Sequence, residues 1–168
     1  MTADTSLSSC ARAATAAESR FRIDAPVESR NARVVALDAP AAEVLRSVAA
    51  LEWAGARFFV CEPVSVGGGA GSGIGDFLLR GIDGTPAVLG SELDGAHVVV
   101  MVATQDSGAG CAYAIGKACW ERAVMTAGLV LGDGSQTHAV AALRPHARVL
   151  LPSADESDLV ELLTALRV

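Results

Sequence analysis

The stretch Arg33–Pro63, RVVALDAPAAEVLRSVAALEWAGARFFVCEP, carries the clearest fold signal in the chain. Its first residues, 33–38, form a short apolar run of the kind that builds a buried strand. A helix is expected next, because Pro40 suits a first helical turn and apolar residues recur at helical spacing. These apolar residues are Val44, Leu45, Val48 and Leu51. Residues 56–63 form a second apolar run that ends at a proline, so the stretch predicts two parallel strands joined by a right-handed crossover.

Beyond this unit, apolar runs and helical spacings continue to alternate toward the C-terminus. Residues 97–104 predict a strand that is apolar on both faces and is therefore expected at the centre of the sheet. Residues 124–133 and 147–152 predict two more strands. Residues 74–82 fit either a short helix or a strand. The remaining periodic segments predict helices over 111–123, 135–144 and 153–168.

The alternation of strands and helices predicts the fold class. We expect an α/β protein, a single-domain Rossmann-like three-layer sandwich with a mostly parallel sheet of about five strands. Residues 33–168 make up this domain, in agreement with a length of 168 residues. Residues 1–32 differ, with Ser, Thr, Ala and balanced charges, and they predict an N-terminal arm or a partly helical extension.

Composition and charge argue against several classes of function. The net charge is −6, whereas a general nucleic-acid binder needs a basic surface that replaces counterions. No apolar run is long enough to span a bilayer and no signal-peptide pattern is present, so we expect a cytoplasmic protein that binds no membrane. The four cysteines form no Cys-x-x-Cys pair and no metal-ligand spacing with histidine. Neither a disulfide framework nor a metal site is therefore expected.

Ligands of doubly wound sheets bind beyond the carboxyl ends of the strands. Three predicted loops meet this condition, and the first, VSVGGGAGSGIGDFLL over 64–79, has five glycines within seven residues. Glycine permits positive φ and lets main-chain N–H groups approach a ligand closely, which suits a phosphate. The alternative is a flexible connector, or glycines that serve tight packing. The candidate ligand-binding residues of this loop are Gly67, Gly68, Gly69, Gly71, Ser72 and Gly73.

The heptapeptide GGGAGSG at 67–73 is similar to the phosphate loop of the tubulin/FtsZ superfamily, GGGTGSG or GGGTGTG, which opens a helix. Ala70 stands where the family has threonine, and this removes a hydroxyl expected near the phosphates. The resemblance covers only about a dozen residues. It implies a nucleotide-type phosphate cradle, not polymerisation or GTP hydrolysis. The glycine spacing fits neither a dinucleotide fingerprint nor an ordinary P-loop, which needs a following Lys-Ser or Lys-Thr.

The two other loops, 105–110 and 132–137, supply the remaining candidate residues. Ser107, Gly108 and Gly110 precede a predicted helix whose N-terminus could hold a second phosphate or a carboxylate. Ser107 is also suited to cap that helix, and Cys111 in its first turn is either a nucleophile or an inert buried thiol. Asp133 could bind a ribose hydroxyl, or start its own turn through a side-chain hydrogen bond.

The sequence therefore predicts a small-molecule-binding α/β domain whose glycine-rich loop holds a nucleotide or another phosphate-bearing ligand. Neither catalytic residues nor a cofactor can be assigned. One alternative follows from residues 141–168, which resemble the ending of short bacterial proteins labelled 3-methyl-2-oxobutanoate hydroxymethyltransferase. That resemblance implies a transferase acting on a small keto acid, although the genuine enzyme is a longer barrel with carboxylate-bound Mg²⁺. Another alternative is a non-catalytic subunit that assembles into a homo-oligomer, suggested by a mean hydropathy of +0.40.

Overall fold

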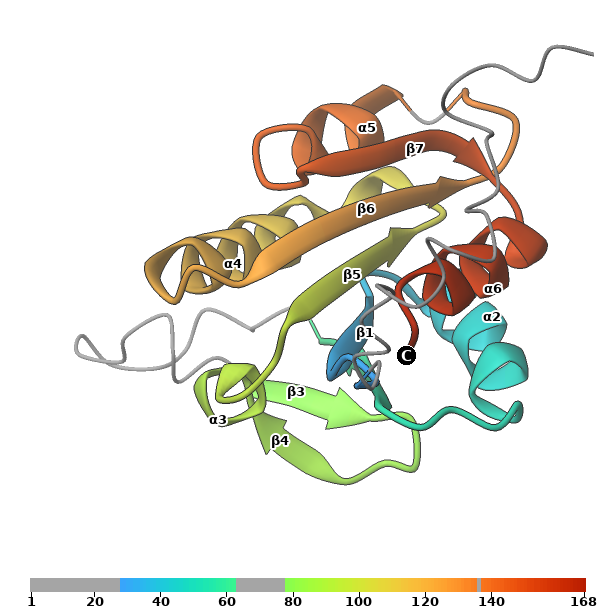
Figure 1. Cartoon of the computed structure of the whole chain (residues 1–168). Helices are drawn as coiled ribbons and strands as arrows, with labels where there is room; N and C mark the ends of the chain where they lie inside the picture. Colours follow the sequence, from blue (N-terminus) through green and yellow to red (C-terminus); the bar gives the residue numbers. More distant parts are fainter. Residues whose placement is uncertain (1–27, 63–77, 136) are drawn as a thin grey trace, which may run out of the picture.

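The computed structural model describes residues 28–62, 78–135 and 137–168, which form one mixed sheet with helices on both faces (Figure 1). The strand order is β4-β3-β2-β1-β5-β6-β7. At one edge, β3 (Leu78–Gly81) pairs antiparallel with β2 and with β4 (Pro86–Val88). The other five strands run parallel, namely β1 (Ala32–Ala36), β2 (Ala56–Cys61), β5 (Val98–Ala103), β6 (Met125–Leu131) and β7 (Val149–Ala154).

The helices divide the core into two clusters, one on each face of the sheet. One face packs against α2 (Ala39–Ala49) and α6 (Glu156–Ala165). The opposite face carries α3, α4 and α5, and a short 3-10 turn, η3, leads into α4. Side chains of β1 and β5 alternate between the two clusters, so these central strands are buried on both faces. The bounds of the second group are α3 (Leu89–Leu93), η3 (Asp106–Gly108), α4 (Ala109–Glu121) and α5 (Thr137–Leu143).

The predicted α/β class and the mostly parallel sheet are confirmed. The sheet has seven strands where the sequence predicted about five, and the difference is the hairpin of β3 and β4. β3 lies within 74–82, the segment that fitted either a short helix or a strand, whereas β4 spans three residues, too few for period-two alternation to reveal it. The strand predicted at the centre, β5, does lie between β1 and β6, and all six of its residues are buried.

The chain order places a topological switch point between β1 and β5. From β1 the chain moves outward to β2 and the hairpin, and it then returns to the other side of β1 to form β5. The loops after β1 and β5 therefore leave the sheet in opposite directions, toward α2 on one face and α4 on the other. In doubly wound sheets, ligands bind at such a switch point, beyond the carboxyl ends of the strands.

The predicted N-terminal arm, 1–32, lies largely outside the described residues. Within it, residues 28–31 approach the sheet, and Ala32 already belongs to β1. The Arg30 N–H donates to the carbonyl of Arg167, 2.9 Å away, so the two ends of the described chain meet. In the portion of the chain that the structure covers, no helix has the length and apolar character needed to cross a membrane.

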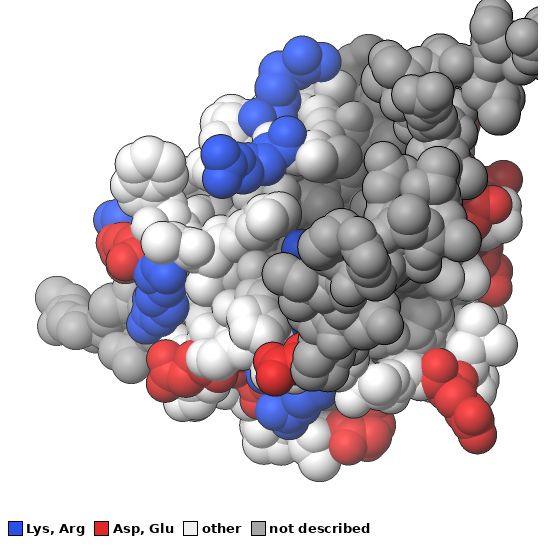
Figure 2. Space-filling model, in the orientation of Figure 1, with Lys and Arg blue, Asp and Glu red and all other residues white. Residues whose placement is uncertain are grey.

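Charged side chains are unevenly distributed on the face seen in Figure 2. On the upper side of this face, basic side chains lie without acidic neighbours, whereas basic and acidic side chains lie beside one another along the left-hand and lower sides. The net charge of −6 is therefore compatible with a locally basic region.

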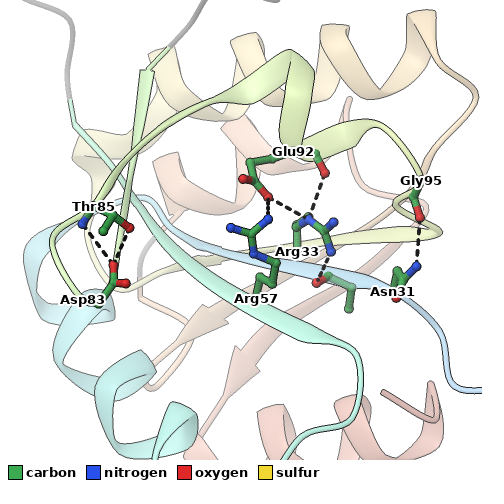
Figure 3. A network of polar contacts seen from close by, with 8 residues as sticks. Asn31, Arg33, Arg57, Asp83, Thr85, Glu92 and Gly95 are labelled. Carbon is green, nitrogen blue, oxygen red and sulfur yellow. Dashed lines mark hydrogen bonds and ion pairs between the residues drawn. The ribbon is translucent and has the colours of Figure 1, made fainter.

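A buried ion-pair network joins β1, β2 and α3 near the amino ends of these strands (Figure 3). Arg33 and Arg57 are cross-strand neighbours in register, which would repel each other without an anion between them. Glu92 supplies this anion: its Oε2 lies 3.2 Å from Arg33 Nε and 2.7 Å from Arg57 Nη1. Arg33 Nε also donates to the Glu92 carbonyl at 2.8 Å. Burial lowers the pKa of Arg33, and the Glu92 carboxylate opposes this effect.

Candidate functional site

Asp38 lies in the loop after β1. Its side chain connects this loop to the loop that follows β5. Its Oδ1 accepts hydrogen bonds from the Ala41 N–H at 2.9 Å and from Thr104 Oγ1 at 2.6 Å. Its Oδ2 accepts from the N–H groups of Thr104 and Gln105, at 2.8 and 2.9 Å. One carboxylate therefore caps α2 and fixes the start of the loop after β5. The side chain is 7% exposed, so these bonds are shielded from water.

Replacement of Asp38 by alanine is expected to destabilise the fold by about 2–3 kcal/mol, because it leaves an uncapped helix and several unpaired N–H groups. Asp38→Asn retains one carbonyl oxygen and should cost about half as much. Urea unfolding followed by circular dichroism measures both differences. Equal stability of Asp38→Ala and the wild type would show that the carboxylate does not hold the two loops.

The N-terminus of α4 opens at the same edge of the sheet. Its N-cap residue is Gly108, so the prediction that Ser107 caps the helix is wrong. Gly108 is required for close packing, because a Cβ on it would lie 2.6 Å from the Cβ of Leu37 at the end of β1. In contrast, a Cβ on Gly110 would meet no atom within 4 Å. Ser107 and Gly110 are exposed, whereas Cys111 and Ala112 in the same turn are buried.

A disulfide joins Cys61, the last residue of β2, to Cys111 in the first turn of α4, with a Cα–Cα distance of 6.2 Å. The expectation of no disulfide is therefore wrong, because the two cysteines are 50 residues apart and only the fold brings them together. The sulfur of Cys111 is bonded to Cys61, which removes the predicted nucleophile. Cys119 is a buried free thiol whose pKa desolvation raises to about 12, so it stays protonated and unreactive at neutral pH.

Asp133 lies in the loop after β6, next to the loop after β5. Its side chain accepts from the Ser135 N–H at 3.0 Å, and this turn-forming bond is the alternative role that the sequence offered. Hydrogen bonding with Ser135 lowers the pKa of Asp133, so the carboxylate is ionised at neutral pH. The helix predicted over 135–144 is α5, which spans Thr137–Leu143. Ser153 Oγ donates to the Gly132 carbonyl at 2.9 Å and ties this loop to β7.

The structure brings together part of the predicted set. Ser107, Gly108 and Gly110 share one turn, and α5, which follows the Asp133 loop, packs against η3 and α4. The six candidates of the glycine-rich loop, Gly67, Gly68, Gly69, Gly71, Ser72 and Gly73, lie outside the described residues.

The residues that flank the glycine-rich segment do lie at the carboxyl edge. Glu62 follows Cys61 directly, and β3 resumes at Leu78, one position from the Leu79 that pairs with Cys61. Glu62 also forms a two-point ion pair with Arg80, at 2.6 and 3.1 Å. The segment therefore leaves and re-enters the sheet beside the first turn of α4.

Sequence reasoning missed Asp38 and the disulfide at this edge. An aspartate between an apolar run and Ala-Pro is a readable helix-cap signal, so Asp38 could have been found. In the three described ranges, no group of three or more His, Cys, Asp or Glu side chains is arranged to hold a metal ion. The sequence matches no protein-family model, and a comparison with curated proteins gives no match either.

Proposed function

We propose that the chain is a Rossmann-like three-layer α/β domain that binds a small phosphate-bearing molecule, such as a nucleotide, at the carboxyl edge of its sheet. The observation that carries this proposal is the position of α4, whose N-terminus opens at the switch point with a glycine at its N-cap and an unobstructed Gly110. Free N–H groups and the positive end of the helix dipole stabilise an anion at such a terminus.

Two further features support the same edge. The disulfide holds the end of β2 beside α4, so both flanks of the glycine-rich segment start from the place where the anion would sit. Asp133, on the neighbouring loop, is exposed and ionised, and it suits a ribose hydroxyl rather than a phosphate. The phosphate would therefore lie at α4, and a sugar would extend toward the loop after β6.

Thermal unfolding in the presence of candidate ligands tests the proposal. A panel of nucleotides, coenzyme A and phosphosugars is compared with 3-methyl-2-oxobutanoate, which is anionic but carries no phosphate. A ligand present at about 100 times its Kd should stabilise the native state by roughly 2.7 kcal/mol. A response to the keto acid alone would favour the transferase alternative. No response to any compound at millimolar concentration would contradict the proposal.

Substitutions of Gly110 locate the ligand within the chain. Gly110→Asp places a carboxylate at the second helical position, where the helix dipole tolerates it, and should abolish stabilisation by the phosphate ligand. Gly110→Ala is the matched control, since a Cβ meets no atom there and the stability of the free protein should change by no more than about 0.5 kcal/mol. An unchanged ligand response in Gly110→Asp would place the phosphate elsewhere.

A further inference from the structure

A groove of about 910 Å³ lies at the opposite, amino edge of the sheet, between the C-terminal half of α4 and the chain entering β6 and β7. Its size falls within the range of small-molecule sites. It shares no residue with the carboxyl-edge site proposed above. The side chains that give it chemical character are His97, Tyr113, Lys117, Trp120, His146 and Arg148.

One wall of the groove is a stripe along α4. Tyr113, Lys117 and Trp120 follow one another at spacings of four and three residues, so they share a face of the helix. Trp120 is 86% exposed and Tyr113 is 55% exposed, although the chain has only seven aromatic residues. An indole this accessible offers a flat surface on which another ring can stack.

The floor of the groove is held in a fixed position by backbone packing. The ring of His146 lies directly on Gly116, where a Cβ would approach ring atoms to 2.4–2.5 Å. Tyr113 contacts the same ring edge-to-face, with centroids 5.8 Å apart. The His146 N–H donates to the Leu143 carbonyl at 2.9 Å, and the His146 carbonyl accepts from Thr126 Oγ1. The Tyr113–His146 pair is therefore held in place against α4.

The charge of the groove is opposite to that of the whole chain. Lys117 and Arg148 line it together with two histidines, and none of the lining residues within the described ranges is an aspartate or a glutamate. His97 Nδ1 accepts from the Asn31 N–H at 3.1 Å, so its remaining nitrogen carries the proton and is a donor. Two acidic groups lie close to the groove: Glu121 follows Trp120 at the end of α4, and Glu28 lines an adjoining hollow together with Arg30 and Arg122.

We propose that this groove binds a small anion that carries a flat aromatic ring. The ring stacks on Trp120, and the anionic group pairs with Lys117 and Arg148. A second copy of the chain in a symmetric contact fits less well, because each lysine and arginine would then face the same cations of its partner.

Binding of 2-naphthoate to the ¹⁵N-labelled full-length chain tests this proposal. The indole resonance of Trp120 should shift saturably, whereas that of Trp53 should not, since Trp53 Nε1 donates to the Val48 carbonyl away from the groove. The neutral 2-naphthamide and the ringless acetate should bind at least about tenfold more weakly. Equal shifts with naphthoate and naphthamide, or no saturation up to about 10 mM, would overturn the proposal.

Matched variants test whether naphthoate binding depends on the groove residues or only on the overall charge of the protein. Trp120→Ala and Lys117→Ala should each weaken naphthoate binding at least about tenfold in ligand-observed titrations, and Lys117→Arg should restore it. The side chains of Trp120 and Lys117 are both exposed, so these variants should retain the fold. Arg46→Ala removes an exposed cation from α2 on the other face and should change nothing. Unchanged affinity in Lys117→Ala would refute the anion requirement. A Trp120 shift that depends on protein concentration without probe would assign the surface to self-association instead.

Discussion

Replacement of Glu92 by alanine is expected to destabilise the fold by about 3–5 kcal/mol, because it removes the carboxylate that pairs with both Arg33 and Arg57. Arg33 is 9% exposed and would keep its positive charge inside the protein without a partner. Arg57 lies beside Arg33 across β1 and β2, so the two guanidinium groups would also repel each other. Urea unfolding of Glu92→Ala measures the loss as a lower midpoint at an unchanged slope.

Three further variants isolate the charge from the side-chain volume. Glu92→Gln preserves the shape but not the charge, and should therefore lose nearly as much stability as Glu92→Ala. Arg57→Ala removes a side chain that is 59% exposed, and should cost no more than about 1 kcal/mol. The double variant Glu92→Gln/Arg33→Met, which empties the network of its buried charges, should recover most of the loss. A loss below about 0.5 kcal/mol in Glu92→Ala would show that water already solvates Arg33.

The parts of the fold that could be predicted are those in which each residue repeats a local pattern. β5 is apolar along its whole length, and α2 has a proline in its first turn and presents apolar residues at helical spacing. The antiparallel hairpin follows no such rule, because Pro86–Val88 has only three residues and its pairing with β3 depends on the turn at Gly84. Element type was therefore readable from the sequence, and the strand count was not.

The candidate site also has one part that could be predicted from the sequence and one part that could not. The loops after β5 and β6 could be placed at the carboxyl edge from strand direction alone, since all parallel strands end on the same side. Asp38 contacts Thr104 from 66 residues away, and that contact depends on β1 and β5 being neighbours. No local pattern reports this, because the chain forms β2, β3 and β4 before it returns to β5. The return of the chain to β5 also brings together the two cysteines that form the disulfide.

Reduction of the Cys61–Cys111 disulfide is expected to lower the free energy of unfolding by about 4 kcal/mol, the loop entropy released when a crosslink 50 residues apart is opened. The closed loop contains the glycine-rich segment, whose unfolded chain has especially many conformations to lose. Cys61 and Cys111 are buried beside Leu37 and Val35 in one core cluster, so reduction should leave the native fold in place. Urea unfolding with and without a phosphine reductant measures the difference.

The double variant Cys61→Ala/Cys111→Ala provides the control, because its stability should not respond to the reductant. Mass spectrometry of the unreduced digest should find the two cysteine peptides linked, and separate peptides would contradict the crosslink.

Disulfides are rare in a reducing cytoplasm, which is the compartment that the sequence predicts. There the dithiol form would prevail, and the tether between β2 and α4 would be released. If α4 and the glycine-rich segment act together on a phosphate, the affinity for that ligand should then be lower in the reduced protein than in the oxidised one.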